Sequence, residues 1–203
     1  MIEWPRKSIN MNQLSLDERA KKYIKKTSIE GLLIIEREQF DEERGFFREI
    51  FHLDELEYVI GRDFKPIQWN HSLSKPKVIR GIHPDPWDKL VYPVTGEVFV
   101  AIVDIEPDSP TFKKVETFVI NDKNRHALFL EKRLGNSVCV MGDMDSHYMY
   151  LVNSYWDGHA ASGMRAVNIY DPDLNIDWPV KDPIISDKDK NNQTLRELFP
   201  EAF

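Results

Sequence analysis

The chain has 203 residues, a formal net charge of -7 and 41% hydrophobic residues. This acidic balance argues against non-specific nucleic-acid binding, so any anionic ligand needs a local basic cluster. No stretch reaches the length of a membrane span, and the charged N-terminus lacks the apolar core of a signal peptide. We therefore expect a cytoplasmic protein with one sizeable domain and neither a nucleic-acid nor a membrane partner.

The N-terminal residues have a pattern of their own, and residues 1–28 are expected to be an N-terminal extension. Ser15 and Glu18 have the spacing of a capping box ahead of a charged run, which predicts a short helix. Residues 29–203 are expected to form a single domain that includes the C-terminal tail.

From Gly31 onward, short β-branched and aromatic runs alternate with turn-rich segments, a spacing typical of an all-β sandwich or jelly roll. The predicted strands are 32–35, 46–51, 66–71, 90–94, 98–105, 114–120, 127–130, 137–141 and 148–154. The pair on either side of Thr95-Gly96 predicts a β-hairpin. The last third of the chain is rich in Pro and Asp and predicts irregular chain, with a short helix at 194–198.

Two residues of this pattern are candidates for acid–base chemistry. His83 ends the apolar run 79–82 and can act as a base at the mouth of the predicted hairpin, or can only satisfy local backbone groups. Tyr150 shares a strand face with Tyr148 and is a candidate acid, with a core or rim aromatic as the alternative.

Other common chemistries lack their motifs. The six histidines are never spaced i, i+2 or i, i+4, so no metal site is expected. The nine glycines form neither a dinucleotide fingerprint nor a phosphate loop, and no serine-hydrolase elbow is present, so no cofactor is expected. Metal-free acid–base chemistry by a His, a Tyr and a carboxylate in a β cavity remains.

Nine short motifs, weak one by one but specific in their order, resemble the dTDP-4-keto-6-deoxyhexose 3,5-epimerases, the dTDP-4-dehydrorhamnose epimerase family. They lie at 43–49, 68–72, 80–83, 89–91, 96–99, 109–112, 155–156, 173–179 and 185–189. The resemblance implies a cupin-type double-stranded β-helix, a jelly roll with short terminal helices. It also implies a metal-free isomerase, usually a homodimer, that acts on a nucleotide-diphosphate 4-keto sugar in deoxysugar biosynthesis for cell-surface polysaccharide.

The resemblance also implies roles for individual residues. His83 is the general base and pairs with Asp189 of the tail, Tyr150 is the acid on the opposite sugar face, and Lys89 meets the developing enolate oxygen. A ketone at C4 acidifies the protons on C3 and C5, which makes this chemistry possible. The positions that match the family's substrate pocket, around the sugar, the nucleotide base and the diphosphate, are Arg44, Phe47, Glu49, Gln68, Asn70, Arg80, Asn136, Trp156 and Lys188.

This chain departs from the family pattern at several of these places. Asn136 stands where the rhamnose-pathway enzymes carry a histidine, and Val100 stands where they carry the aspartate that pairs with it. Trp156 occupies the position of the aromatic residue that stacks on the nucleotide base in the family. Residues 84–88, the loop after His83, also differ from the family sequence. A paired loss is a coherent change of pocket, because a buried aspartate without its histidine is costly. We therefore expect a different substrate, such as a GDP-linked 4-keto heptose, or inversion of one carbon only.

Two further functions stay open on the sequence. A 3,4-ketoisomerase of the same superfamily would move the carbonyl rather than invert a centre. A non-catalytic sugar-nucleotide binding protein would keep the fold, but retention of His83, Tyr150, Lys89 and Asp189 together argues against it.

Overall fold

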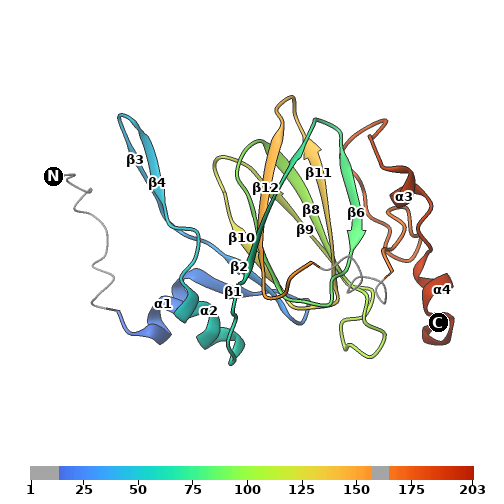
Figure 1. The fold of residues 1–203 in the computed structure, drawn as a ribbon, viewed down its shortest axis with the longest axis horizontal. Coiled ribbons are helices and arrows are strands. Elements are labelled where there is room, and N and C mark those ends of the chain that lie inside the picture. Colours follow the sequence, from blue (N-terminus) through green and yellow to red (C-terminus); the bar gives the residue numbers. More distant parts are fainter. Residues whose placement is uncertain (1–13, 157–164) are drawn as a thin grey trace.

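The computed structural model describes residues 14–156 and 165–203, and strands dominate these two ranges (Figure 1). The strands are β1 (Ile24–Lys26), β2 (Leu32–Ile35), β3 (Gln39–Glu42), β4 (Gly45–Arg48), β5 (Gln68–Ser74), β6 (Ile79–His83), β7 (Lys89–Pro93), β8 (Glu97–Asp104), β9 (Val115–Ile120), β10 (Ala127–Leu130), β11 (Leu134–Met141) and β12 (Ser146–Val152). The helices are α1 (Leu16–Tyr23), α2 (Leu53–Ile60), α3 (Asp187–Lys190), α4 (Leu195–Leu198) and the 3-10 turn Pro200–Ala202.

Two sheets form the body of the molecule. One has six strands in the order β1-β2-β10-β7-β12-β5, and the other has four in the order β6-β11-β8-β9. Val91 and Leu128 of the first sheet and Val100, Ile102 and Val138 of the second belong to one buried core. Residues that alternate along each strand meet between the layers and stabilise them by burying apolar surface. The arrangement is the all-β jelly roll that the sequence predicts.

The two N-terminal helices cover the outer face of the six-stranded sheet (Figure 1). Ser15 caps α1 through the predicted capping box, in which the Glu18 backbone N–H donates to the Ser15 side chain. Leu56 of α2 is completely buried in a cluster with Phe64 and Phe129. Strand β1 already pairs with β2, so residues inside the expected extension contribute to the sheet. The division at residue 28 stays a prediction.

The predicted hairpin around Thr95-Gly96 is wrong. Strand β7 pairs with β10 and β12, whereas β8 pairs with β9 and β11, so the turn carries the chain from one sheet to the other. Gly96 has a φ of 73°, and the Thr95 hydroxyl donates to the Asp145 carbonyl at 3.2 Å, which anchors the crossing. Both strands are apolar on both faces and have no edge in the finished sheets, so alternation could not identify their partners.

The C-terminal tail packs on the outer face of the four-stranded sheet. Val167, Ile169 and Leu195 form a third buried cluster with Ile79 and Ile82 of β6. Apart from short helices, the tail is irregular, as predicted, and isolated bridges such as Ile82 with Val167 hold it against β6. This contact brings α3 to the end of the strand that carries His83. In the described ranges, no helix is both long and apolar enough to cross a membrane.

Candidate active site

Two adjoining cavities open between the sheets and the tail. The larger has a volume of about 480 Å³ and the smaller about 170 Å³, and His83, Asp85 and Tyr150 line both. The larger is also lined by Gln68, Asn70, Trp87, Trp156, Arg165, Lys188 and Asn192, among others. The smaller is also lined by Ser72, Arg80, Lys89, Asn136, Val138 and Tyr148. Most of the positions that the sequence singled out therefore converge on one cleft.

His83 and Asp189 form a hydrogen-bonded pair at the cleft. His83 Nε2 lies 2.7 Å from Asp189 Oδ1, the imidazole side chain is 42% exposed, and the carboxylate side chain is only 6% exposed. The Ser186 side chain caps α3 by accepting from the Asp189 backbone N–H at 3.1 Å, which fixes the position of the Asp189 backbone. A buried orienting carboxylate beneath a half-exposed imidazole is the arrangement of a general base.

The charge of Asp189 is stabilised by its neighbours. Burial alone would raise the pKa of this carboxyl, but the hydrogen bond and charge of His83 and the Gly81 backbone N–H outweigh it. The pKa of Asp189 is therefore held well below its usual range. An ionised Asp189 accepts the Nε2 proton of His83, which leaves Nδ1 as the free basic nitrogen.

Gly81 is required at its position by the same carboxylate. Its backbone N–H donates to Asp189 Oδ2 at 3.2 Å. A Cβ added at Gly81 would lie 2.8 Å from both Cγ and Oδ1 of Asp189, closer than real contacts allow. Glycine in the predicted motif 80–83 thus makes room for the tail to reach the histidine.

Tyr150 faces the cleft from the opposite wall. It lies on β12 of the six-stranded sheet, whereas His83 ends β6 of the four-stranded sheet. Burial raises the pKa of Tyr150, and the nearby Asp85 carboxylate raises it further, while Arg80 acts in the opposite direction. The phenol is therefore kept protonated, as an acid must be.

Tyr148 and Asn136 both line the smaller cavity and contact each other. The Tyr148 hydroxyl donates to Asn136 Oδ1 at 3.4 Å, and burial raises the pKa of Tyr148 well above its ordinary value. Asn136 pairs with His83 across β6 and β11. Val100 is completely buried one diagonal position away on β8, because Val138 pairs with Val100 and Asn136 with Ile102. Asn136 and Val100, for which the sequence analysis expects a paired change, are therefore diagonal neighbours in the sheet.

Lys89 enters the smaller cavity from the first position of β7. Its side chain is 4% exposed, and Nζ lies 2.6 Å from Asp85 Oδ2. Nζ also donates to the His83 carbonyl at 3.4 Å. Asp85 is a cavity residue to which sequence reasoning assigned no role, although its spacing of four residues before Lys89 was visible.

The remaining polar residues of the cleft support one another. Gln68 donates to Asn70 Oδ1 at 2.7 Å and accepts from the Trp156 backbone N–H at 3.0 Å. Arg80 donates to Ser74 Oγ at 2.8 Å and to the Leu73 carbonyl. Lys188 and Arg165 add positive charge at the rim of the larger cavity, and Arg165 was not singled out by the sequence.

Arg44, Phe47 and Glu49 do not line either cavity of this chain. Arg44 lies at the tip of the β3–β4 hairpin, which projects away from the sandwich (Figure 1). Phe47 is on the same hairpin and stacks on Phe40. Glu49 follows the hairpin and lies 3.2 Å from His52.

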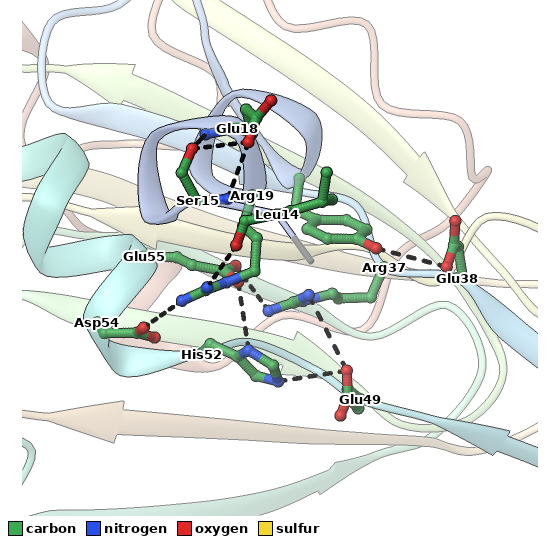
Figure 2. Close-up of polar contacts among 11 residues, drawn as sticks. Leu14, Ser15, Glu18, Arg19, Arg37, Glu38, Glu49, His52, Asp54 and Glu55 are labelled. Carbon is green, nitrogen blue, oxygen red and sulfur yellow. Dashed lines mark hydrogen bonds and ion pairs between the residues drawn. The ribbon is translucent and has the colours of Figure 1, made fainter. Parts of the chain in front are cut away.

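Glu49 belongs instead to a cluster under the two N-terminal helices, the Glu55 cluster, shown in Figure 2. Its members are Arg19, Arg37, Glu49, His52, Asp54 and Glu55. His52, Asp54 and Glu55 have potential metal-ligand atoms within 4.8 Å of one another. However, the Glu55 oxygens already face Arg19 at 3.1 Å and Arg37 at 2.7 Å. Two guanidinium groups supply the positive charge, so the group is an ion-pair cluster and not a metal centre.

Known proteins are similar to this chain in both sequence and fold. The family model described as dTDP-4-dehydrorhamnose 3,5-epimerase matches residues 26–197. The dTDP-4-dehydrorhamnose 3,5-epimerase of Shigella flexneri is 37% identical over 172 residues, which cover 83% of this chain and 93% of that protein. The dTDP-4-dehydrorhamnose 3-epimerase of Streptomyces niveus is 34% identical, with 83% and 82% covered.

A solved structure extends the likeness to three dimensions. NovW, a 4-keto-6-deoxy sugar epimerase from the novobiocin biosynthetic gene cluster of Streptomyces spheroides, superposes with a TM-score of 0.81 at 32% identity. The match covers 88% of this chain and 89% of NovW. The family model, the sequence relatives and the solved structure each match more than four fifths of this chain. The chain belongs to the dTDP-4-dehydrorhamnose 3,5-epimerase family of isomerases.

Proposed function

We propose that the protein inverts C3, C5 or both in a nucleotide-diphosphate 4-keto-6-deoxy sugar or heptose, with His83 as base and Tyr150 as acid. The observation that supports this most is their placement on opposite walls of one cleft. Inversion requires a proton to leave from one face of the ring and another to arrive on the opposite face. Two groups on one wall would return the proton to the face that it left.

The steps follow from the cleft's own residues. His83 Nδ1 takes the proton from C3 or C5, and the C–H electrons move into the ring bond while the carbonyl electrons move to the C4 oxygen. Asp189 stabilises the imidazolium through Nε2. Lys89, whose side chain is only 4% exposed, stabilises the enolate oxygen. The Tyr150 hydroxyl then protonates the same carbon from the other face, and the carbonyl forms again.

The cations of the cleft suit the diphosphate of the substrate. Lys188 and Arg165 lie at the larger cavity and Arg80 at the smaller. They give an acidic protein the local anion site that its overall charge does not provide. The relatives include both 3,5-epimerases and a 3-epimerase, so the number of inverted centres depends on the pocket.

The β3–β4 hairpin supports a homodimer. Phe46 and Phe47 are 61% and 41% exposed there, next to Arg44, a position that the family resemblance assigns to the substrate pocket. In a dimer the hairpin of one chain can reach the cleft of the other, which would bury this apolar surface and complete the pocket. We place the enzyme in the cytoplasm, in deoxysugar biosynthesis for cell-surface polysaccharide.

Incubation of the protein with candidate substrates in D2O tests the proposal. NMR would follow deuterium at C3 and C5 of dTDP-4-keto-6-deoxyglucose and of a GDP-linked 4-keto heptose. Exchange with inversion is expected, and the departures at Asn136 and Val100 favour the heptose. A carbonyl that moves from C4 to C3 would instead identify a ketoisomerase, and binding without exchange a non-catalytic protein.

A further inference from the structure

The loop between β6 and β7 holds an acidic residue in a fixed place beside the reacting groups. Asp85 stands between Pro84 and Pro86, which restrict the backbone on both sides. Its carbonyl accepts from the Arg133 backbone N–H at 2.8 Å. At the end of the loop, the Asp88 side chain accepts from Arg62 at 2.5 Å and from Asn153 at 3.1 Å. The carboxylate of Asp85 is therefore presented to the cleft by a well-anchored loop.

One oxygen of Asp85 holds Lys89. The Oδ2–Nζ distance is 2.6 Å, and the two side chains are 22% and 4% exposed. An ammonium group has three N–H donors. Asp85 and the His83 carbonyl account for two of them, so one remains for an oxygen in the cavity. The carboxylate thereby determines where the free donor of the lysine points.

The other oxygen, Oδ1, is not part of this ion pair. Asp85 lines both cavities, as do His83 and Tyr150. Within residues 14–156 and 165–203, no hydrogen bond to Asp85 Oδ1 is found. An ionised carboxylate oxygen in a partly buried cleft accepts strongly from a hydroxyl group, and an unsatisfied one is unfavourable.

We propose that Asp85 is a positioning and specificity residue, which holds Lys89 against the keto oxygen and accepts a hydrogen bond from the adjacent sugar hydroxyl. The proposal rests on the proposed function of the cleft. The keto oxygen and the hydroxyl on the neighbouring carbon are attached to adjacent ring atoms. Lys89 can therefore donate to the keto oxygen while Asp85 accepts from the hydroxyl. A substrate without that hydroxyl leaves the carboxylate unsatisfied and is bound more weakly.

Three variants test the proposal: Asp85→Asn, Lys89→Met and the double variant. NMR would measure kcat and KM for deuterium exchange at C3 and C5. Asp85→Asn should lower kcat by about 10- to 100-fold, the range of a lost charge-assisted contact. In the Lys89→Met background the same change should leave kcat nearly unaffected but still raise KM, because only the hydroxyl contact remains to be lost.

Two controls separate this role from a structural one. Asp145→Asn removes an exposed carboxylate from a turn outside the cleft and should leave both constants unchanged. Asp85→Glu keeps the charge and should recover part of kcat. Equal kcat losses from Asp85→Asn with and without Lys89 would contradict the positioning role, and an unchanged KM in both backgrounds would contradict the hydroxyl contact. An inactive wild-type protein would contradict the proposed function itself.

Discussion

Asp189 in the cleft and Glu55 under the N-terminal helices are both buried carboxylates held by basic side chains. Asp189 pairs with one half-exposed histidine and a backbone N–H. Glu55 is completely buried and faces Arg19 and Arg37, with His52 at 3.3 Å (Figure 2). Arginine keeps its charge at all working pH values, whereas histidine changes charge near neutrality and has a second ring nitrogen.

The difference shows how similar ion pairs acquire different roles. In the Glu55 cluster, each guanidinium group faces two carboxylates of the protein, and α1, α2 and the base of the hairpin are joined. At Asp189 the partner is a histidine that lines a cavity and has a second ring nitrogen outside the ion pair. Substitution in the first region should therefore change stability, and substitution in the second should change proton transfer.

His83→Ala is expected to give the largest effect. Loss of the proposed base should lower deuterium exchange at C3 and C5 by about 10³-fold or more, since His83 is the only histidine among the described residues that line the cleft. The measurement is the NMR exchange rate at saturating substrate. His52→Ala is the matched control from the Glu55 cluster and should retain exchange. Equal losses in the two variants would remove the distinction between the regions.

Glu55→Gln should reverse that pattern. Without the carboxylate, Arg37 keeps only Glu49, at 4.0 Å, and Arg19 keeps only Asp54, and breaking the two buried pairs costs about 3–5 kcal/mol of unfolding free energy. Urea denaturation followed by circular dichroism would measure the loss. Asp54→Asn, at the more exposed end of the cluster, should cost less than about 1 kcal/mol. Exchange per folded molecule should stay near the wild-type value in both.

Asp189→Asn should lower the exchange rate by about 10²-fold, because an amide stabilises the imidazolium poorly. It also gives a pH test. The pKa of Asp189 is lower in the folded state than its ordinary value of 3.8, so its contribution to stability is complete above that value and is lost as the pH falls through the folded value. Between about pH 7 and about pH 3, the wild type should lose more unfolding free energy than the variant. Equal losses of unfolding free energy in the wild type and the variant would show that the ion pair with His83 does not stabilise the charged form of Asp189.

Tyr150→Phe should uncouple the two halves of the reaction. Proton removal from the His83 wall can continue, but return from the opposite wall needs the phenol, so net inversion should fall by about tenfold or more while exchange persists. Comparison of deuterium content with product stereochemistry, both by NMR, would separate the steps. If rate and product composition were unaltered, another group would have to be the acid.

Gly81→Ala should give the smallest effect and tests the geometry alone. The added methyl group would meet the Asp189 carboxylate at 2.8 Å and displace it from His83. Exchange should fall several-fold, with a stability loss of about 1 kcal/mol from local overpacking. Gly142→Ala is a useful control for a glycine with open space, although its φ of 65° adds backbone strain. An unaffected exchange rate in Gly81→Ala would mean that the tail adjusts without loss of the pair.

Local signals made part of this molecule predictable. The capping box at Ser15 and the strands 32–35 and 127–130 were visible because each is determined by neighbours in sequence. Helix α2 was missed because its N-cap, His52, makes no side-chain capping bond and provides no start signal. The sheet partners of β7 and β8 were mistaken because strands that are apolar on both faces fit several positions.

The candidate site was predictable only through resemblance. His83, Tyr150, Lys89 and Asp189 converge on the cleft as expected, but nothing in their spacing alone requires it. The role of Asp85 depends on the course of a short loop, and the placement of Arg44 depends on where a hairpin points. Such features arise from tertiary packing, which a local pattern does not encode.

The pairing of His83 with Asp189 joins residues 106 positions apart, and Asp189 follows every strand of the described chain. A ribosome synthesises the chain from the N-terminus, so every strand of the described chain has emerged before this carboxylate does. All the strands are therefore synthesised while the imidazole still lacks its partner. Because Val167, Ile169 and Leu195 of the tail also cover Ile79 and Ile82 of β6, the segment that brings Asp189 to His83 is the same one that completes the third buried cluster.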